Sequence, residues 1–173
     1  MLLSLFYYLN KELKLSYVTY LKLTGTRQGL ISAKCSTLES IGNRFQSGHE
    51  DEIQVLTLNH NISRNQNVSH HPVQFIKPID MSSPLLGVSI SSNEQLEAIF
   101  TCYRTNQSGH LELYYKLKLT KASIVDISST YTNATNSNGI IPHEKILLNY
   151  ESISWEHITA GTSGYSITES NMF

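Results

Sequence analysis

The ten residues HLELYYKLKL, at positions 110–119, decide the fold class of this chain. Their apolar side chains recur at every second position, which is the period of a strand with one face in a core and the other in water. The preceding residues 96–104 can form a partner strand, and TNQSG at 105–109 supplies a turn. The sequence therefore predicts a β-hairpin. Its buried face would carry Leu111, Leu113, Tyr115, Leu117 and Leu119.

Further strands are predicted on both sides of this hairpin. They fall at residues 17–23, 29–36, 52–62, 72–78, 122–131 and 143–157. Pro72 and Pro78 confine one of these strands to an edge, or else mark its two ends. The apolar phase of the last segment slips between Tyr150 and Ile153, as a β-bulge would cause. About seven or eight strands indicate a mainly β chain, either a barrel or a sandwich.

One short helix is predicted near the middle of the chain. Ser82 or Ser83 can cap its start, and Pro84 suits its first turn. A buried stripe is expected from Leu85, Leu86, Val88 and Ile90, although the glycine and serines nearby favour a helix only weakly. This helix should need tertiary packing to persist.

The chain divides into one domain with two flanking segments. Residues 16–164 hold the regular β pattern, residues 1–15 are an extension of uncertain origin, and residues 165–173 are expected to be a loosely held tail. The apolar run at 2–9 is too short to span a bilayer, so no membrane insertion is expected. Its lysines follow the run instead of preceding it, which is not typical of a signal peptide.

Composition argues against nucleic acid as a partner and against a disulfide-bonded scaffold. The 173 residues carry 13 Lys plus Arg against 14 Asp plus Glu, a net charge of -1, and no basic stripe interleaved with aromatics. Nucleic acid is therefore not an expected partner. The two cysteines, Cys35 and Cys102, cannot form a disulfide framework, which favours a reduced, cytosolic start.

Two histidine-containing stretches are candidates for a metal or acid/base site. His49 and Glu50 begin an H-E-x-x-H pattern, but isoleucine stands at position 53, where the second histidine would be needed. His70 and His71 are adjacent, so on a strand they would point to opposite faces. We expect no catalytic residue, no metal site and no cofactor. HEDE at 49–52 is interpreted as the entrance to a strand whose core face starts at Ile53.

A long segment without periodicity precedes HEDE. A loop of about a dozen residues is unusual between strands, and such loops are commonly functional or disordered. Its members are Thr37, Leu38, Glu39, Ser40, Ile41, Gly42, Asn43, Arg44, Phe45, Gln46, Ser47 and Gly48.

Several short segments together resemble the haemolysin-coregulated protein (Hcp) family, the tube proteins of type VI secretion systems. The segments are GLISA at 29–33, SIGN at 40–43, GHEDEI at 48–53, FIKPID at 75–80 followed by Ser83-Pro84, CYR at 102–104, and WEHITAGTSG at 155–164. The resemblance covers residues 16 to about 164, whereas residues 1–15 have no counterpart.

This resemblance implies a two-sheet, β-barrel-like single domain with one short α-helix beside it. It also implies homohexameric rings that stack into a tube inside a contractile sheath, with a VgrG spike protein at the tip. The tube would assemble in the bacterial cytoplasm and be secreted without a signal peptide, carrying small noncovalently bound effector proteins. Such a subunit is structural and not an enzyme.

The resemblance also assigns roles to particular residues. The loop at 37–48 would reach the neighbouring ring and mediate stacking. The helix residues Ser83, Pro84, Leu85 and Leu86 would line or flank the channel. As a separate hypothesis, His49, Glu50, Asp51 and Glu52 lie near a subunit or ring contact, where rim charges set register more than affinity.

Two other functions are alternatives to the tube subunit. A β-sandwich binding module, such as an adhesin or a carbohydrate-binding domain, would fit the Tyr-rich strands but would require an export signal. A zinc hydrolase would use His49 and its neighbouring carboxylates but lacks the second histidine.

Overall fold

The computed structural model describes residues 17–133, 135 and 139–168. Its strands are β1 (Tyr17–Gly25), β2 (Gly29–Leu30), β3 (Ile53–Val55), β4 (Thr57–Asn59), β5 (Ile62–Arg64), β6 (Val68–His70), β7 (Val73–Pro78), β8 (Leu96–Thr105), β9 (Leu111–Thr130), β10 (His143–Asn149), β11 (Ser152–His157) and β12 (Thr162–Ile167). Its helices are α2 (Leu38–Ile41), the 3-10 turn η1 (Gly42–Arg44) and α3 (Ser83–Ser91). The predicted extension at 1–15 lies outside the described residues.

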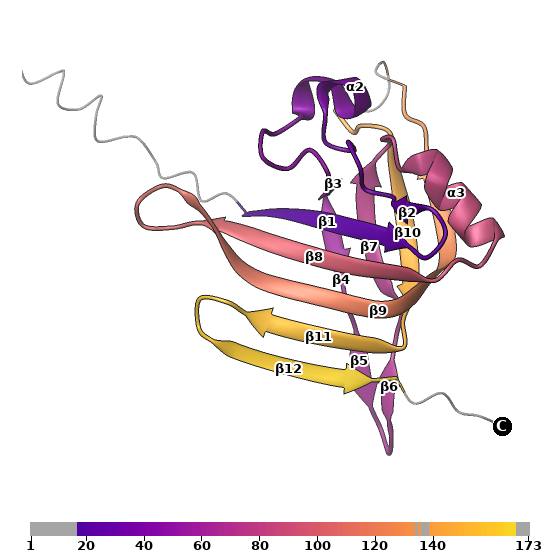
Figure 1. Ribbon diagram of the computed structural model, residues 1–173, viewed down its shortest axis with the longest axis vertical. Helices are drawn as coiled ribbons and strands as arrows, with labels where there is room; N and C mark the ends of the chain where they lie inside the picture. The colour runs from indigo at the N-terminus through magenta and orange to yellow at the C-terminus, as the bar shows by residue number, and fades with distance from the viewer. Residues whose placement is uncertain (1–16, 134, 136–138, 169–173) are drawn as a thin grey trace, which may run out of the picture.

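The fold is mainly β, with two large antiparallel sheets that share strand β9 (Figure 1). The first sheet pairs β1 with β8, β8 with the first half of β9, that half with β11, and β11 with β12. The second sheet pairs the later half of β9 with β10, β10 with β7, and β7 with β4. The strand order runs from β2 to β4, so the arrangement is barrel-like but open.

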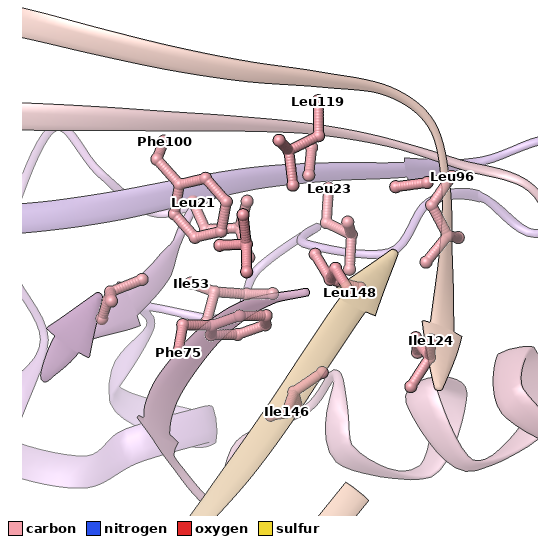
Figure 2. Close-up of a cluster of buried hydrophobic side chains, with 14 of the residues drawn as sticks. Leu21, Leu23, Ile53, Phe75, Leu96, Phe100, Leu119, Ile124, Ile146 and Leu148 are labelled. Atoms are coloured by element: carbon pink, nitrogen blue, oxygen red, sulfur yellow. The ribbon is translucent and has the colours of Figure 1, made fainter. Parts of the chain in front are cut away.

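The hydrophobic core lies between the two sheets (Figure 2). Leu21 and Leu23 point inward from β1 and meet Phe100 and Leu119 of the first sheet. Phe75, Ile146 and Leu148 come from the second sheet, and the Phe75 and Phe100 rings meet edge to face with centroids 5.5 Å apart. Ile53 is fully buried, as predicted from the alternation that follows HEDE.

The predicted hairpin is present as β8 and β9, but its five residues do not share one face. The register moves between Cys102 and Tyr103, where Tyr114 is the extra residue of a bulge. Because side chains alternate along a strand, this insertion turns Leu111 and Leu113 away from the face that carries Leu117 and Leu119. Leu117 and Leu119 are buried, whereas Leu111 is exposed.

Strand β9 continues where two strands were predicted. A second register shift, near Lys121 with its positive φ of 48°, bends β9 so that its later half enters the second sheet. The separate strand predicted at 122–131 is therefore the continuation of β9.

The last predicted strand is divided where its apolar phase slips. β10 belongs to the second sheet and β11 to the first, so the slip marks a crossing between sheets instead of a bulge. β12 pairs with β11 and extends to Ile167, three residues into the segment expected to be a loose tail.

Two other predicted strands also differ from the structure. The strand predicted at 29–36 is only Gly29–Leu30, followed by a turn. The strand predicted at 52–62 is split at Leu56 into β3, which pairs with β1, and β4, which pairs with β7. Between the predicted strands at 52–62 and 72–78, the structure has a hairpin of β5 and β6. The prolines do mark the ends of β7, which is paired on both sides.

Among the described residues, no helix has both the length and the apolar character needed to cross a bilayer.

Candidate functional site

The segment at 37–48 is a loop whose two ends are fastened together. The Ser36 amide donates to the Glu50 carbonyl (3.1 Å), and the Ser36 hydroxyl donates to the Glu52 carbonyl (2.6 Å). The Lys34 amide donates to the Asp51 carboxylate at 3.0 Å. The loop therefore stands on a closed base at one end of the molecule, at the top of Figure 1.

This loop contains helical structure, although its sequence shows no periodicity. α2 and η1 together span residues 38–44, too few to show a helical repeat in sequence. The amide of Met81 donates to the Ser40 hydroxyl at 2.9 Å, which attaches α2 to the turn before α3. Leu38 and Phe45 are 58% and 46% exposed. The loop thus presents two large apolar side chains to solvent from a structured support.

A shallow cleft of about 310 Å³ adjoins this loop. Arg44 of η1 lines one part, and the other lining residues include Leu56, Ile76, Ile140 and His143. Leu56 and Ile140 are exposed, so apolar surface continues from the loop onto the connection between β3 and β4 and the segment before β10.

The HEDE residues have partners within the chain. The carboxylate of Glu50 accepts from the Gly48 amide at 3.0 and 3.1 Å, and this bond holds the Glu50 pKa below its usual range. Asp51 accepts from Lys34, and Glu52 accepts from Nδ1 of His49. These carboxylates therefore fix the base of the loop, whatever they contact in an assembly.

His49 covers a tyrosine that sequence reasoning missed. Its ring stacks on Tyr20 with centroids 3.9 Å apart, and Tyr103 approaches the His49 edge at 5.1 Å. The Tyr20 hydroxyl bonds to Gln46 of the loop. Tyr20 is only 1% exposed, and burial together with Glu52 and Tyr103 raises its pKa to about 12. The sequence did contain a signal for this contact. Tyr20 is adjacent to the core residue Leu21 on a strand, so the Tyr20 side chain must lie on the outer face of the sheet.

α3 is attached at its start by a buried ionic network. Nζ of Lys77 lies 2.9 Å from both Asp80 and Glu144. The Ser83 hydroxyl donates to Glu144 at 2.8 Å, which connects the first turn of the helix to β10. The Lys77 side chain is 0% exposed. The network fixes where α3 begins relative to β7 and β10.

A second network holds the residues that follow α3. The Glu94 carboxylate accepts from the Arg27 amide (2.7 Å), from the amide and side chain of Gln28 (2.8 and 2.7 Å), and from Ser89 (3.2 Å). Burial alone would raise the pKa of Glu94, but the bonds from Gln28, Arg27 and Ser89 lower it to about 2. The carboxylate is therefore ionised across the neutral range.

The inward face of α3 differs from the predicted stripe. Leu86 and Ser89 are buried and Ile90 packs against the core, whereas Leu85 and Val88 are exposed. Of the four helix residues predicted to flank a channel, Ser83 and Leu86 fasten the helix. Pro84 and Leu85 are exposed. Two apolar side chains, Leu85 and Val88, therefore face away from the sheets.

The structure does not assemble a metal site around the candidate histidines. Within the described part of the chain, no group of three or more His, Cys, Asp or Glu side chains is placed to hold a metal ion. His71 bonds to Ser63 on its own hairpin, at 2.9 Å, whereas His70 contacts Tyr150 and Ser166.

Comparison with known proteins gives concordant matches. The sequence model of a family described as "Type VI secretion system effector, Hcp" matches residues 20–157. The "Major exported protein" of Pseudomonas aeruginosa is 38% identical over 158 residues, which cover 84% of this chain and 91% of that protein. A solved structure described as "Crystal structure of Hcp protein" has a TM-score of 0.86 and 32% identity, and covers 90% of this chain and 100% of the other.

A further relative is longer than this chain. The "Uncharacterized protein YhhZ" of Escherichia coli (strain K12) is 42% identical over 149 residues, which cover 86% of this chain but 37% of YhhZ. The chain thus spans well under half the length of YhhZ, and it matches a single region of it.

Proposed function

Since the chain belongs to the Hcp family of type VI secretion proteins, we propose that it is a structural tube subunit that assembles into hexameric rings. The rings stack into a tube that a contractile sheath propels, and the subunit is itself exported. The observation that carries this proposal is the match to the "Major exported protein", which extends over 91% of that relative. The role is one of assembly and not of catalysis.

Ring closure needs two different patches on each subunit that fit one another. Identical subunits close into a ring through such a head-to-tail contact. β12 supports this proposal, because its described pairing is with β11 alone and its other edge can accept a neighbour. Tyr165 and Ile167 on β12 are exposed and would contribute apolar area to that contact.

Stacking of one ring on the next is assigned to the loop at 37–48. The exposed Leu38 and Phe45 supply the apolar anchors that such a contact requires, and the closed base keeps them in position. His49, Glu50, Asp51 and Glu52 would lie at the margin of the contact, where their main task is to hold the loop.

α3 is proposed to flank the channel of the ring. Pro84 and Leu85 are the exposed residues of its first turn, while Ser83 and Leu86 keep the helix against the sheets. The tube would carry small effector proteins noncovalently and meet a VgrG spike protein at its tip. Assembly would take place in the bacterial cytoplasm, before secretion.

Electron microscopy of the purified protein tests the ring directly. Ring-shaped particles with sixfold symmetry are expected, and sedimentation should give a hexamer mass. A strict monomer across a wide range of concentrations would contradict the proposal.

The stacking role is tested with a paired substitution of Leu38→Ser and Phe45→Ser. Both side chains are exposed, so folding and ring formation should persist while stacked tubes and secretion are lost. Leu111→Ser, at an exposed position on the β8–β9 hairpin, is the matched control and should leave stacking unchanged. Tubes formed normally by the double variant would remove the loop from the contact.

The role of the acidic residues is tested with Glu50→Ala and Asp51→Ala together. Loss of these charges and of the loop-base bonds should change ring stacking and its dependence on salt. Stacking that is identical to the unmodified protein over a salt series would remove this role.

A further inference from the structure

Two histidines and a tyrosine meet where the β5–β6 hairpin contacts the body of the molecule. His60 precedes β5, His70 ends β6, and Tyr150 lies between β10 and β11. Nε2 of His60 is 2.9 Å from the Tyr150 hydroxyl oxygen, and Nδ1 of His70 is 3.0 Å from the same oxygen. One buried hydroxyl group therefore bridges two half-buried imidazoles.

The same group reaches the β11–β12 hairpin. Nε2 of His70 lies 3.1 Å from the Ser166 hydroxyl of β12, and the His60 ring lies 5.9 Å from the Trp155 ring of β11. We call His60, His70, Tyr150 and Ser166 the histidine cluster. It connects elements that the backbone ladders leave separate, because β5 and β6 pair with each other in a sheet of their own.

The β5–β6 hairpin is joined at its base to the paired strands β4 and β7, and its side depends on contacts such as those of the histidine cluster. A two-stranded hairpin is marginally stable at best by itself. In Figure 1 this hairpin projects from the lower end of the molecule, away from the two large sheets. A change in the histidine cluster can therefore change how the hairpin is attached to the β11–β12 hairpin.

The hydrogen bonds of the cluster are complete when both imidazoles are neutral. Each neutral imidazole has one donor and one acceptor nitrogen, and each hydroxyl has one proton and can also accept. Tyr150 can then donate to one histidine and accept from the other, while Ser166 supplies the remaining bond to His70. One added proton can still be accommodated, because His70 could donate to both hydroxyl oxygens.

No complete hydrogen-bond arrangement exists once a second proton is added. Both imidazoles would then direct N–H groups at the Tyr150 oxygen, and the Tyr150 proton would lose its acceptor. Two positive rings would face one another, which disfavours charging. Burial, and secondarily His70, lower the pKa of His60, while burial raises the pKa of Tyr150 to about 12, so the phenol cannot provide a balancing charge.

The groups packed around the cluster supply no negative charge. His60 faces Tyr150, His70 and Trp155, and His70 faces Tyr150 and Ser166. Among the described residues, neither imidazole has a carboxylate within ion-pair distance, unlike His49 with Glu52. No negative charge in contact with either ring therefore favours its protonation.

We propose that the histidine cluster is an acid-sensitive attachment whose double protonation releases the β5–β6 hairpin from the β11–β12 hairpin. The direction of the pH dependence follows from the lowered pKa of His60, which favours the neutral ring. The hairpin is therefore fully attached above pH 6.5, the ordinary pKa of histidine, and the attachment is lost as pH falls below that value. The release changes the shape of one end of the subunit while the two large sheets stay folded.

Hydrogen exchange on the full-length protein tests the proposal. Backbone amides of β5 and β6 should lose protection on the order of tenfold between about pH 7.5 and about pH 5, after correction for intrinsic exchange rates. Amides of the β8–β9 hairpin are the internal reference and should keep their protection. Unchanged protection of β5 and β6 would overturn the proposal.

Variants separate the cluster from general acid effects. His60→Gln combined with His70→Gln cannot be protonated, so the acid-dependent loss should shrink to less than about twofold. His71→Gln is the control, because His71 bonds to Ser63 and not to the cluster, and it should respond like the unmodified protein. An equal loss in the double variant, or its disappearance in His71→Gln, would overturn the proposal.

A measurement without substitution covers the case in which the double variant fails to fold. Trp155 is the only tryptophan of the chain and lies beside His60, so its fluorescence reports a charge on that ring. A fluorescence change below pH 6.5 should coincide with the loss of β5–β6 protection. A fluorescence change with no accompanying loss of protection would overturn the release.

Discussion

The two ends of the molecule attach their peripheral elements with different chemistry. α3 is fastened through ionised carboxylates, with Lys77 between Asp80 and Glu144 at its start and Glu94 after its end. The β5–β6 hairpin is fastened through neutral imidazoles and hydroxyl groups, with no carboxylate in contact among the described residues.

This difference sets two separate acid limits within one subunit. The histidine cluster should weaken below about pH 6.5, where histidine ordinarily titrates. The stability that the bonds to Glu94 contribute is complete above pH 4.5 and is lost as pH falls from there toward 2, because the pKa of Glu94 is lowered to about 2 in the folded protein. A single chain can therefore change shape at one end under mild acid and keep the other end intact.

The largest effect is expected from Lys77→Met. The substitution removes the cation and leaves Asp80 and Glu144 buried without their partner, which should cost about 3–5 kcal/mol of unfolding free energy. Urea unfolding at neutral pH measures it. Lys118→Met is the control, because the Lys118–Glu97 pair is exposed and should contribute about 1 kcal/mol or less. Equal losses would show that the α3 end does not depend on its ionic network.

Glu94→Gln should have the next largest effect. Hydrogen bonds to a charged acceptor are replaced by weaker ones, at a cost of about 1.5–3 kcal/mol at neutral pH. The unmodified protein should lose stability as pH falls from 4.5 toward 2, since the folded pKa is depressed, and the variant should lose less over that window. Unfolding free energies over a pH series measure both. Glu97→Gln, on an exposed pair, should leave the pH profile unchanged.

Gly25→Ala tests how tightly Glu94 is held. An added Cβ would clash with Oε1 of Glu94 and lie 3.1 Å from Cδ1 of Ile31, so a loss of about 1–3 kcal/mol is expected. Gly87→Ala is the matched control, because nothing lies within 4 Å of a Cβ there and the position is helical. It should be neutral, or more stable by up to about 1 kcal/mol. A tolerated Gly25→Ala would mean that Glu94 can move freely.

Tyr150→Phe should have the smallest effect on global stability. It removes the shared hydroxyl but keeps the ring, so the loss should be about 0.5–1.5 kcal/mol. Protection of the β5–β6 amides should fall more than that of the large sheets, because only the hairpin attachment is affected. Hydrogen exchange and urea unfolding together measure the difference. Tyr131→Phe, at a largely exposed tyrosine, should change neither.

The fold class and the hairpin could be predicted because both depend on local alternation. The strands β1, β7, β8 and β9 lie where apolar residues recur with period 2. The bulge at Tyr114 could not be predicted, because its neighbours keep the same alternation in sequence and only the partner register reveals the extra residue. The division of 143–157 left a signal, the slip at Tyr150, but a slip does not distinguish a bulge from a change of sheet.

The positions of the candidate surfaces followed from the resemblance, whereas their supporting contacts did not. Lys77 and Glu144 are 67 residues apart, and Gln28 and Glu94 are 66 apart, so no local pattern connects them. The short helix α2 was missed because four residues cannot display a helical period. The outward direction of Leu85 and Val88 was missed because Ser89, a polar residue, faces the core instead.

The course of β9 through both sheets has a mechanical consequence. Ladder hydrogen bonds lie perpendicular to antiparallel strands. A force along one half of β9 therefore loads the ladders of that half in shear, those to β8 and β11 in the first half and that to β10 in the second. The two sheets are also joined along this side by the continuous backbone of β9, a strand of 20 residues. A subunit built in this way should resist a pull along β9 as one body.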